Sequence, residues 1–216
     1  VYTAAVHPDN PEFQAAKAKG IPMMPRADLL GEMMRNYKHA VNISGTHGKT
    51  TTTSMLTEIL LAAEADPTVT VGGILPAIGG NIRVGGPEFF VAEACEYTNS
   101  FLSFFPTLEI ILNIEADHLD FFKDLEDIRH SFRLFAQKLD ENGVLIINRD
   151  IERMEEITEG LPCKVITFGK DPEKSIYSAA DIVFDQLARA SYTLLIEGRP
   201  EGTITLGVPG MHNVYN

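Results

Sequence analysis

A glycine-rich run near the end of the first quarter of the chain has the residue types of a phosphate-binding loop. It reads SGTHGKTT over residues 44–51, follows an apolar stretch and precedes a stretch with helical periodicity. Glycines let successive backbone N–H groups point inward at phosphate oxygens, and a helix N-terminus adds partial positive charge. The loop departs from the strict G-x-x-x-x-G-K-[ST] pattern, because Ile43 stands where the first glycine belongs. The expected phosphate-binding residues are Gly45, Thr46, His47, Gly48, Lys49, Thr50 and Thr51.

Within this loop, two side chains have the chemistry that a bound nucleotide needs. Lys49 is expected to reach the β- and γ-phosphates, and the Thr50 hydroxyl is expected to ligate Mg²⁺. The alternative is a chance turn that binds nothing, and the strand–loop–helix context disfavours it.

Further polar groups follow two apolar runs, where metal ligands are expected at the carboxyl ends of parallel strands. Glu93 follows the run Phe89–Ala92, and His118 belongs to the polar segment Asn113–Asp120 that follows another apolar run. A neutral imidazole can ligate a second metal ion. Both features have plainer interpretations: Glu93 could be a solvated strand-end carboxylate, and His118 could pack beside an aspartate that caps the next helix.

Apolar and helical segments alternate along the chain, which predicts an α/β fold. The expected fold is a P-loop-type, doubly wound, mostly parallel sheet flanked by helices. After residue 180 short strands follow one another without helices, so a small antiparallel subsheet is expected near the C-terminal end. The predicted strands are 1–6, 39–44, 89–94, 108–114, 143–148, 164–168, 182–184, 191–196 and 203–206. The predicted helices are 11–19, 49–63, 125–139 and 151–159. A further helix is predicted to be capped by Asp28 and to end at Arg35.

Composition restricts the classes of function. Of 216 residues, 44% are hydrophobic and 22% charged, as in ordinary globular proteins, and the formal net charge is −12. That charge repels nucleic-acid backbones, so no nucleic-acid partner is expected. No stretch reaches the roughly 18 apolar residues that span a bilayer, so membrane insertion is not expected either. The two cysteines lack metal or disulfide spacing and are expected as free thiols in a reducing cytoplasm.

Several ordered segments resemble those of the Mur ligases, which build the peptide of bacterial cell-wall precursors. The GTHGKT loop resembles that family's shortened phosphate loop. The ending GMHNVYN (residues 210–216) resembles the family's G-x-H-N-x-x-N, which leads into a helix beside the adenine. The other similar segments are Gly79-Gly80-Asn81, residues 93–96, residues 100–102 and residues 113–120.

The resemblance implies an ATP-dependent, ADP-forming ligase with ATP and Mg²⁺ as cofactors. Lys49 and Thr50 would hold phosphates and Mg²⁺, Glu93 the first metal and His118 the second. Asn81 and Ser100 would face the substrate. His212, Asn213 and Asn216 would line the adenine pocket.

The variant with His47, followed by threonines to Thr53, is similar to the family member that adds L-alanine to UDP-N-acetylmuramate. The implied reaction phosphorylates the lactyl carboxylate, and the amine of L-alanine then displaces phosphate. Several sister ligases carry a carbamylated lysine near the place of Arg133, and an arginine cannot form a carbamate. The stretch Cys95–Asn99 departs from a more acidic family form, which weakens any metal role for Glu96.

The resemblance also divides the chain. Residues 1–38 resemble the C-terminal part of a Rossmann-like UDP-binding domain, and residues 39–216 a truncated central ATP-binding domain. The amino-acid-binding domain is expected beyond Asn216, so this chain alone is expected to bind nucleotide weakly and not to complete ligation.

Other readings stay open from the sequence. A sister ligase that recycles whole peptides onto the same UDP-sugar shares the GTHGKT loop but favours an aspartate-rich segment after the metal-binding glutamate. Folate polyglutamate ligases resemble GTNGKGS and lack His47. A more distant alternative is another P-loop phosphotransferase, which has no need of residues 113–120 or 210–216. The sequence does not define an oligomeric state.

Overall fold

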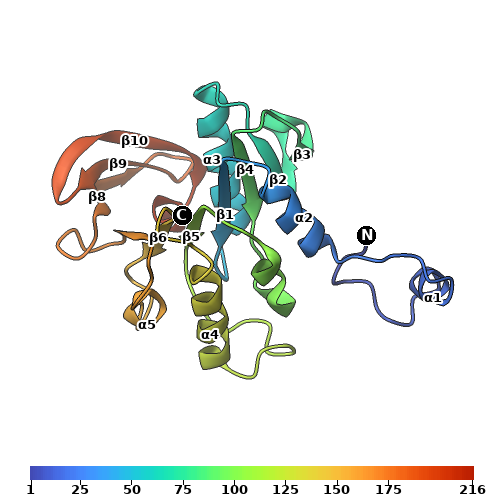
Figure 1. The fold of residues 1–216 in the computed structure, drawn as a ribbon. Coiled ribbons are helices and arrows are strands. Elements are labelled where there is room, and N and C mark those ends of the chain that lie inside the picture. The colour runs from blue at the N-terminus through green and yellow to red at the C-terminus, as the bar shows by residue number, and fades with distance from the viewer.

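The computed structural model describes residues 1–216 as an α/β fold built on one ten-stranded sheet (Figure 1). The strands lie in the order β10-β9-β8-β7-β6-β5-β1-β4-β2-β3. Their bounds are β1 His39–Ser44, β2 Thr68–Leu75, β3 Gly80–Arg83, β4 Phe89–Glu93, β5 Leu108–Ile111, β6 Val144–Asn148, β7 Lys164–Phe168, β8 Tyr177–Phe184, β9 Arg189–Ile196 and β10 Arg199–Pro209. The helices are α1 Pro11–Ala18, α2 Arg26–Met34, α3 Lys49–Ala62, α4 Leu125–Ala136 and α5 Glu155–Thr158, with short 3₁₀ helices η1 Pro76–Ile78, η2 Tyr97–Ser103 and η3 Met211–Val214.

The middle of the sheet is parallel, as the sequence predicts. Strand β1 lies between β4 and β5, and β2, β6 and β7 continue the parallel arrangement outward. In register, Ile43 on β1 lies opposite Glu93 on β4 and Ile110 on β5. The carboxyl ends of β1, β4 and β5 therefore meet at one edge, where the sequence places its polar segments.

Apolar side chains cover both faces of the sheet, which makes it doubly wound. On one face α3 packs over β1, β2 and β4, with a core that includes Ile43, Val69 and Leu112. On the other face a larger core includes Phe101, Phe132 and Phe135, contributed by η2 and α4. The Phe101 and Phe135 rings stack at a centroid distance of 4.5 Å. The predicted fold class is confirmed.

Antiparallel strands extend the sheet at both ends. At one end β8, β9 and β10 form the predicted subsheet, which continues directly from β7. At the other end β2 and β3 form a hairpin-like pair that the sequence analysis did not predict. Strand β2 contains Gly72 and Gly73, and glycines lower the apparent strand propensity of a segment.

Three predictions are contradicted by the structure, whereas the other predicted elements are present with the same or shifted ends. Residues 1–6 form no strand, because only Tyr2 makes a bridge, to Pro25. Asp28 does not cap a helix: α2 starts at Arg26 with Pro25 as its N-cap, so Asp28 lies in the first turn. Of the helix predicted over 151–159, only the four residues of α5 are α-helical.

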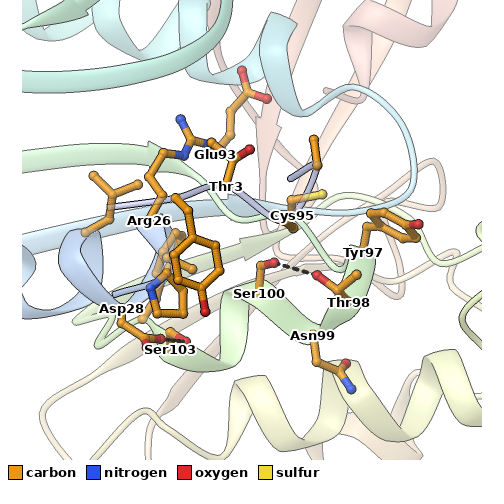
Figure 2. A pocket seen from close by; sticks show the side chains of 17 residues that line it. Thr3, Arg26, Asp28, Glu93, Cys95, Tyr97, Thr98, Asn99, Ser100 and Ser103 are labelled. Carbon is orange, nitrogen blue, oxygen red and sulfur yellow. Dashed lines mark hydrogen bonds between the residues drawn. The ribbon is translucent and has the colours of Figure 1, made fainter. Parts of the chain in front are cut away.

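The N-terminal segment extends away from the sheet, and α1 lies on the side opposite to β8–β10 (Figure 1). Helix α1 has no buried residue. Residues 2–5 and the start of α2 line one side of a pocket of about 540 Å³, and η2 lines the other (Figure 2). No helix of the structure has both the length and the apolar character needed to cross a membrane.

Helix α2 approaches η2 closely at Gly31, which is buried. A Cβ atom at this position would overlap the carbonyl oxygen of Ser103. The contact is reinforced by a hydrogen bond of 2.6 Å from the Ser103 hydroxyl to Asp28.

We therefore expect Gly31→Ala to lower the free energy of unfolding by about 1–3 kcal/mol, because overpacking outweighs the better helix propensity of alanine. Urea unfolding measures the change. Gly80→Ala is the matched control, since a Cβ there meets no atom within 4 Å. Equal effects of the two substitutions would contradict the close approach.

Glu109 is an acid buried in the middle of the sheet. It lies on β5 opposite Asn42 and Leu145, and its exposed fraction is 0%. Burial raises the pKa of the Glu109 carboxyl well above its usual value of 4.5, and the nearby Ser44 hydroxyl offsets only part of that shift. That hydroxyl donates at 3.0 Å to the carbonyl of Ile110.

Above pH 4.5 the unfolded chain releases this proton while the folded chain retains it, so the free energy of unfolding falls as pH rises towards the folded-state pKa. We expect Glu109→Gln to raise the melting temperature at pH 8 and to have little effect near pH 4. Thermal unfolding followed by circular dichroism tests this, with the exposed Glu88→Gln as control. A gain that is independent of pH, or a loss at pH 8, would refute the assignment of a neutral buried acid.

Candidate active site

The glycine-rich loop connects β1 to α3 at the carboxyl edge of the sheet. Gly48 is the N-cap of α3, with a left-handed φ of 87°, and no side chain caps the helix. A Cβ on Gly48 would come within 2.5 Å of Asn216 Oδ1, so the loop passes directly beside the end of the chain. The first N–H groups of a 14-residue helix therefore face the loop without a side-chain partner.

Asn113 fixes the path of the loop. Its Oδ1 accepts from the His47 N–H at 2.8 Å, and its Nδ2 donates to the His47 carbonyl at 2.9 Å. Next to it, the Thr46 N–H donates to the Asn113 carbonyl at 3.1 Å, and the Glu115 N–H donates to the Thr46 hydroxyl at 2.9 Å. The segment after β5 thus acts as a backbone template for the loop. The sequence analysis singled out this segment for His118 and missed the role of Asn113.

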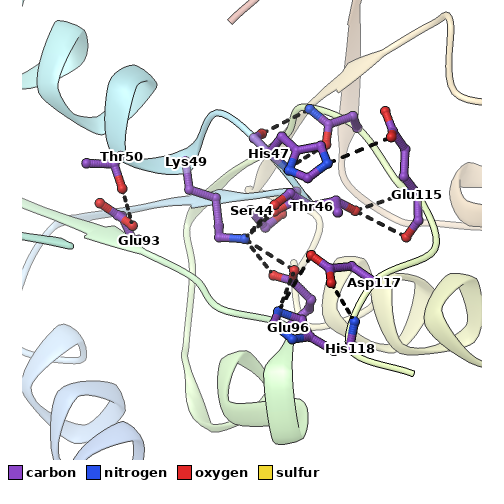
Figure 3. Close-up of polar contacts among 12 residues, drawn as sticks. Ser44, Thr46, His47, Lys49, Thr50, Glu93, Glu96, Glu115, Asp117 and His118 are labelled. Carbon is purple, nitrogen blue, oxygen red and sulfur yellow. Dashed lines mark hydrogen bonds and ion pairs between the residues drawn. The ribbon is translucent and has the colours of Figure 1, made fainter. Parts of the chain in front are cut away.

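Lys49 lies at the centre of the polar cluster (Figure 3). Its ammonium contacts Glu96 Oε2 at 2.9 Å and Oε1 at 3.2 Å, and also donates to the carbonyls of Gly45 and Thr46. Glu96 has an exposed fraction of only 2%. His118 lies on the other side of this carboxylate, with Nε2 at 3.9 Å from Glu96 Oε1. The sequence therefore located Lys49 and His118 but not the glutamate between them.

Glu93 lies apart from this pair and contacts Thr50. The Thr50 hydroxyl donates to Glu93 Oε2 at 3.1 Å, and the Gly72 N–H donates to Oε1 at 2.5 Å. A Cβ on Gly72 would meet the Glu93 carboxylate at 2.8 Å, so this glycine leaves the space in which the carboxylate lies. Thr50 and Glu93 are thus brought together, as the sequence analysis expected.

Thr50 and Glu93 provide oxygen atoms that suit a magnesium ion. No three His, Cys, Asp or Glu side chains gather as a self-sufficient metal site. Thr50 and Glu93 offer two hard oxygen donors next to the loop. Mg²⁺ is typically held by one or two carboxylates together with substrate phosphates and water, so these residues fit such an ion.

A second pocket, of about 580 Å³, lies between β5, β6 and η3. His212 and Asn216, two of the residues that the resemblance assigns to the adenine, line this pocket. Asn213 does not line it: its side chain is buried, donates to the Pro209 carbonyl at 2.6 Å and accepts from Asn216 at 2.9 Å. Further polar lining residues that the sequence analysis did not assign to a site are Asn148, Asp150, Glu152, Lys170 and Tyr215.

The pocket between α2 and η2 reaches the same cluster, since Glu93 also lines it (Figure 2). Ser100 lines this pocket and pairs with Thr98 at 2.9 Å. Asn81 does not line it and is exposed on β3. Cys95 contributes a free thiol to the lining of this pocket.

Arg133 lies outside the cluster. Its guanidinium donates to the Glu156 carbonyl and, at 3.0 Å, to the Glu159 carbonyl, at the end of α5. A cation at the C-terminal end of a helix stabilises its unpaired carbonyls. Its contacts therefore support α5.

The loop between β1 and α3, its lysine and the hydroxyl–carboxylate pair lie at the carboxyl edge of the sheet beside two pockets. This is the arrangement of an α/β domain of the P-loop type. Comparison with known families is more specific. A family model described as the Mur ligase middle domain matches residues 43–216, and one described as the Mur ligase family, catalytic domain, matches residues 1–38. The chain belongs to the Mur ligase family.

Individual relatives agree with this assignment. The chain is 67% identical over all 216 residues to a UDP-N-acetylmuramate–L-alanine ligase of Lachnospira eligens and 59% identical to one of Agathobacter rectalis, and it spans 47% of the length of each. Among solved structures, a UDP-N-acetylmuramate–alanine ligase from Thermotoga maritima is similar with a TM-score of 0.84 and 29% identity, over 99% of this chain and 47% of that one. A UDP-N-acetylmuramate:L-alanyl-γ-D-glutamyl-meso-diaminopimelate ligase from Neisseria meningitides gives a TM-score of 0.85 and 25% identity, over 99% of this chain and 70% of that one.

The template role of Asn113 leads to a prediction about the loop itself. In Asn113→Ala the two hydrogen bonds to the His47 backbone are lost, so local opening becomes easier. At about 0.5–1.5 kcal/mol per hydrogen bond, we expect amide exchange of residues 45–48 to accelerate about tenfold. Hydrogen–deuterium exchange with mass spectrometry measures it, with Asn142→Ala in a distant turn as control. Unchanged exchange in the loop would show that Asn113 does not hold it.

Proposed function

We propose that this chain is the ATP-binding part of a ligase that joins L-alanine to the carboxylate of UDP-N-acetylmuramate. The observation that carries the proposal is the arrangement of Lys49, the Thr50–Glu93 pair and His118 between two pockets. The names of the relatives with 67% and 59% identity support the choice of acceptor. Since the chain spans 47% of those relatives, the activity is proposed for the full-length protein.

In this proposal the loop binds the polyphosphate of ATP. The N–H groups of Gly48–Thr51 at the α3 N-terminus face the phosphates, and Lys49 neutralises their charge. The N–H groups of Thr46 and His47 instead bond to Asn113, which holds the loop in place. Thr50 and Glu93 would hold Mg²⁺, and His118 would take part in holding a second ion. Bound metal ions would screen the charge between ATP and the anionic carboxylate. His212 and Asn216 contact the adenine in the pocket of about 580 Å³, with Asn213 behind them.

The pocket between α2 and η2 is proposed to admit the acceptor carboxylate, with Ser100 on its wall. A carboxylate is a poor electrophile, so transfer of the γ-phosphoryl group first gives an acyl phosphate and ADP. The amine of L-alanine then attacks the acyl carbon, the amide bond forms and phosphate leaves. Because Asn81 is exposed and does not line this pocket, its proposed substrate contact has the least support.

The domain assignment and the cellular setting belong to the same proposal. Residues 1–38 would end a UDP-binding domain, and residues 39–216 would form the central ATP-binding domain. The reaction supplies a cytoplasmic precursor for peptidoglycan and so contributes to cell-wall biogenesis, cell shape and cell division. The partners are small molecules, and the formal net charge of −12 disfavours nucleic acid.

ATP-dependent phosphate release by the full-length protein tests the proposal. We expect release that requires both UDP-N-acetylmuramate and L-alanine. Lys49→Ala and His118→Ala should each lower it about 100-fold or more, because each removes a group proposed to stabilise transferred charge. Lys38→Ala, which removes a lysine at the opposite end of β1, is the control.

The outcomes separate the alternatives. Release only with an L-Ala-D-Glu-containing tripeptide in place of L-alanine would move the assignment to the peptide-recycling ligase. Release with neither acceptor would refute the proposed acceptor. Full activity of Lys49→Ala would refute the proposed phosphate site.

A further inference from the structure

We propose that Glu96 is a positioning residue that holds Lys49 while the nucleotide site is empty, and that a polyphosphate must take Lys49 from it. This inference rests on the proposed nucleotide site. It predicts that the carboxylate of Glu96 weakens nucleotide binding, which is the opposite of what a metal ligand or a structural residue does.

The first observation is that the donors of Lys49 are already occupied. Its ammonium is within 3.2 Å of four acceptors: the carbonyls of Gly45 and Thr46 and both oxygens of Glu96. An ammonium group has three N–H donors. No donor is therefore free for a phosphate oxygen unless at least one of these contacts is released.

The second observation is that the pair is shielded from water. The exposed fractions of the side chains are 15% for Lys49 and 2% for Glu96. Charges in such surroundings interact much more strongly than exposed ones. The carbonyls of Gly45 and Thr46 are neutral, so Glu96 is the partner that competes with a phosphate as an anion.

The third observation is that the backbone fixes Glu96 in place. Its carbonyl accepts from the Asn99 N–H at 2.8 Å, and it is the N-cap residue of η2. Two residues before it, the Ala94 N–H donates to the Ile43 carbonyl at 2.8 Å, which ties this segment to β1. The backbone that carries this carboxylate is therefore fixed, so that after Lys49 moves the carboxylate lies close to the incoming phosphates as a like charge.

Glu93, three residues earlier, does not share this role. Its carboxylate contacts the Thr50 hydroxyl and the Gly72 N–H. The two glutamates thus contact different residues of the loop. Glu93 accepts from the Thr50 hydroxyl, and Glu96 accepts from the Lys49 ammonium. His118 Nε2 lies 3.9 Å from Glu96 Oε1 and is the other basic group near this carboxylate.

Titration of ADP onto the full-length protein tests the proposal, with EDTA and separately with Mg²⁺. Glu96→Gln keeps the size and the acceptor oxygen of the side chain but removes its charge. We expect this variant to bind ADP about fivefold or more tightly in both conditions, and its KM for ATP to fall in the same direction. Glu88→Gln is the matched control, because Glu88 also pairs with a lysine, Lys38, but immediately precedes the first residue of β4, at the other edge of the sheet.

Unchanged or weaker binding by Glu96→Gln in EDTA would overturn the proposal. Weaker binding with Mg²⁺ alone would also overturn it and would make Glu96 a metal ligand. Tighter ADP binding by Glu96→Gln, together with no L-alanine-dependent ligase activity in the unsubstituted protein, would support the role of Glu96 and refute the proposed acceptor. The two proposals therefore fail separately.

A measurement on the unsubstituted protein does not depend on the folding of a variant. With selectively ¹⁵N-labelled lysine, the Lys49 ammonium should exchange slowly with water in the nucleotide-free protein, and its signal should shift when ADP binds. Lys49→Arg identifies the signal by removing it. A Lys49 signal that exchanges as fast as those of exposed lysines would overturn the proposal.

Discussion

The structure depends on the burial of β1 between β4 and β5. Because these strands are parallel and in register, their carboxyl ends lie at one edge of the sheet. Three polar segments follow them there: the loop after Ser44, the segment from Glu93 to Glu96, and the segment from Asn113 to His118. Apolar cores on both faces of the sheet hold this register. A phosphate loop needs such support, since its own backbone makes few regular hydrogen bonds and relies on neighbours such as Asn113.

Charge is distributed unevenly around that edge. The chain as a whole is acidic, yet the centre of the cluster is a lysine enclosed by loop carbonyls and one buried carboxylate. Burying a cation requires a close anionic partner, and Glu96 is that partner for Lys49. The same physics explains why burial raises the pKa of the Glu109 carboxyl well above its usual value.

Glu93 and Glu96 are three residues apart in the chain but have different partners. Glu93 ends β4 and faces the hydroxyl at the start of α3, whereas Glu96 begins η2 and faces the ammonium. Between them, Cys95 lines the pocket under α2. One turn of backbone after β4 thus connects the phosphate loop with the pocket that α2 closes. The fit of α2 against η2 at Gly31 sets one wall of that pocket.

The sequence by itself determined the parallel core of the sheet and the phosphate loop, because hydrophobic periodicity and local glycine patterns are properties of contiguous residues. It also placed Lys49, Thr50, Glu93 and His118 at one edge of that sheet, and the resemblance of its ordered motifs to those of the Mur ligases indicated the family. It did not determine β2 and β3, whose glycines hide their strand character, or the isolated bridge that replaces a strand at residues 1–6. Only the tertiary structure decided that Asn113 holds the loop, that Gly72 makes room for Glu93, that Asn213 lies behind its pocket and that Glu96 is the partner of Lys49. Most of these contacts join residues that are far apart in the chain, and others depend on the direction in which a side chain points. The three-dimensional packing of the strands sets both the distances and the directions.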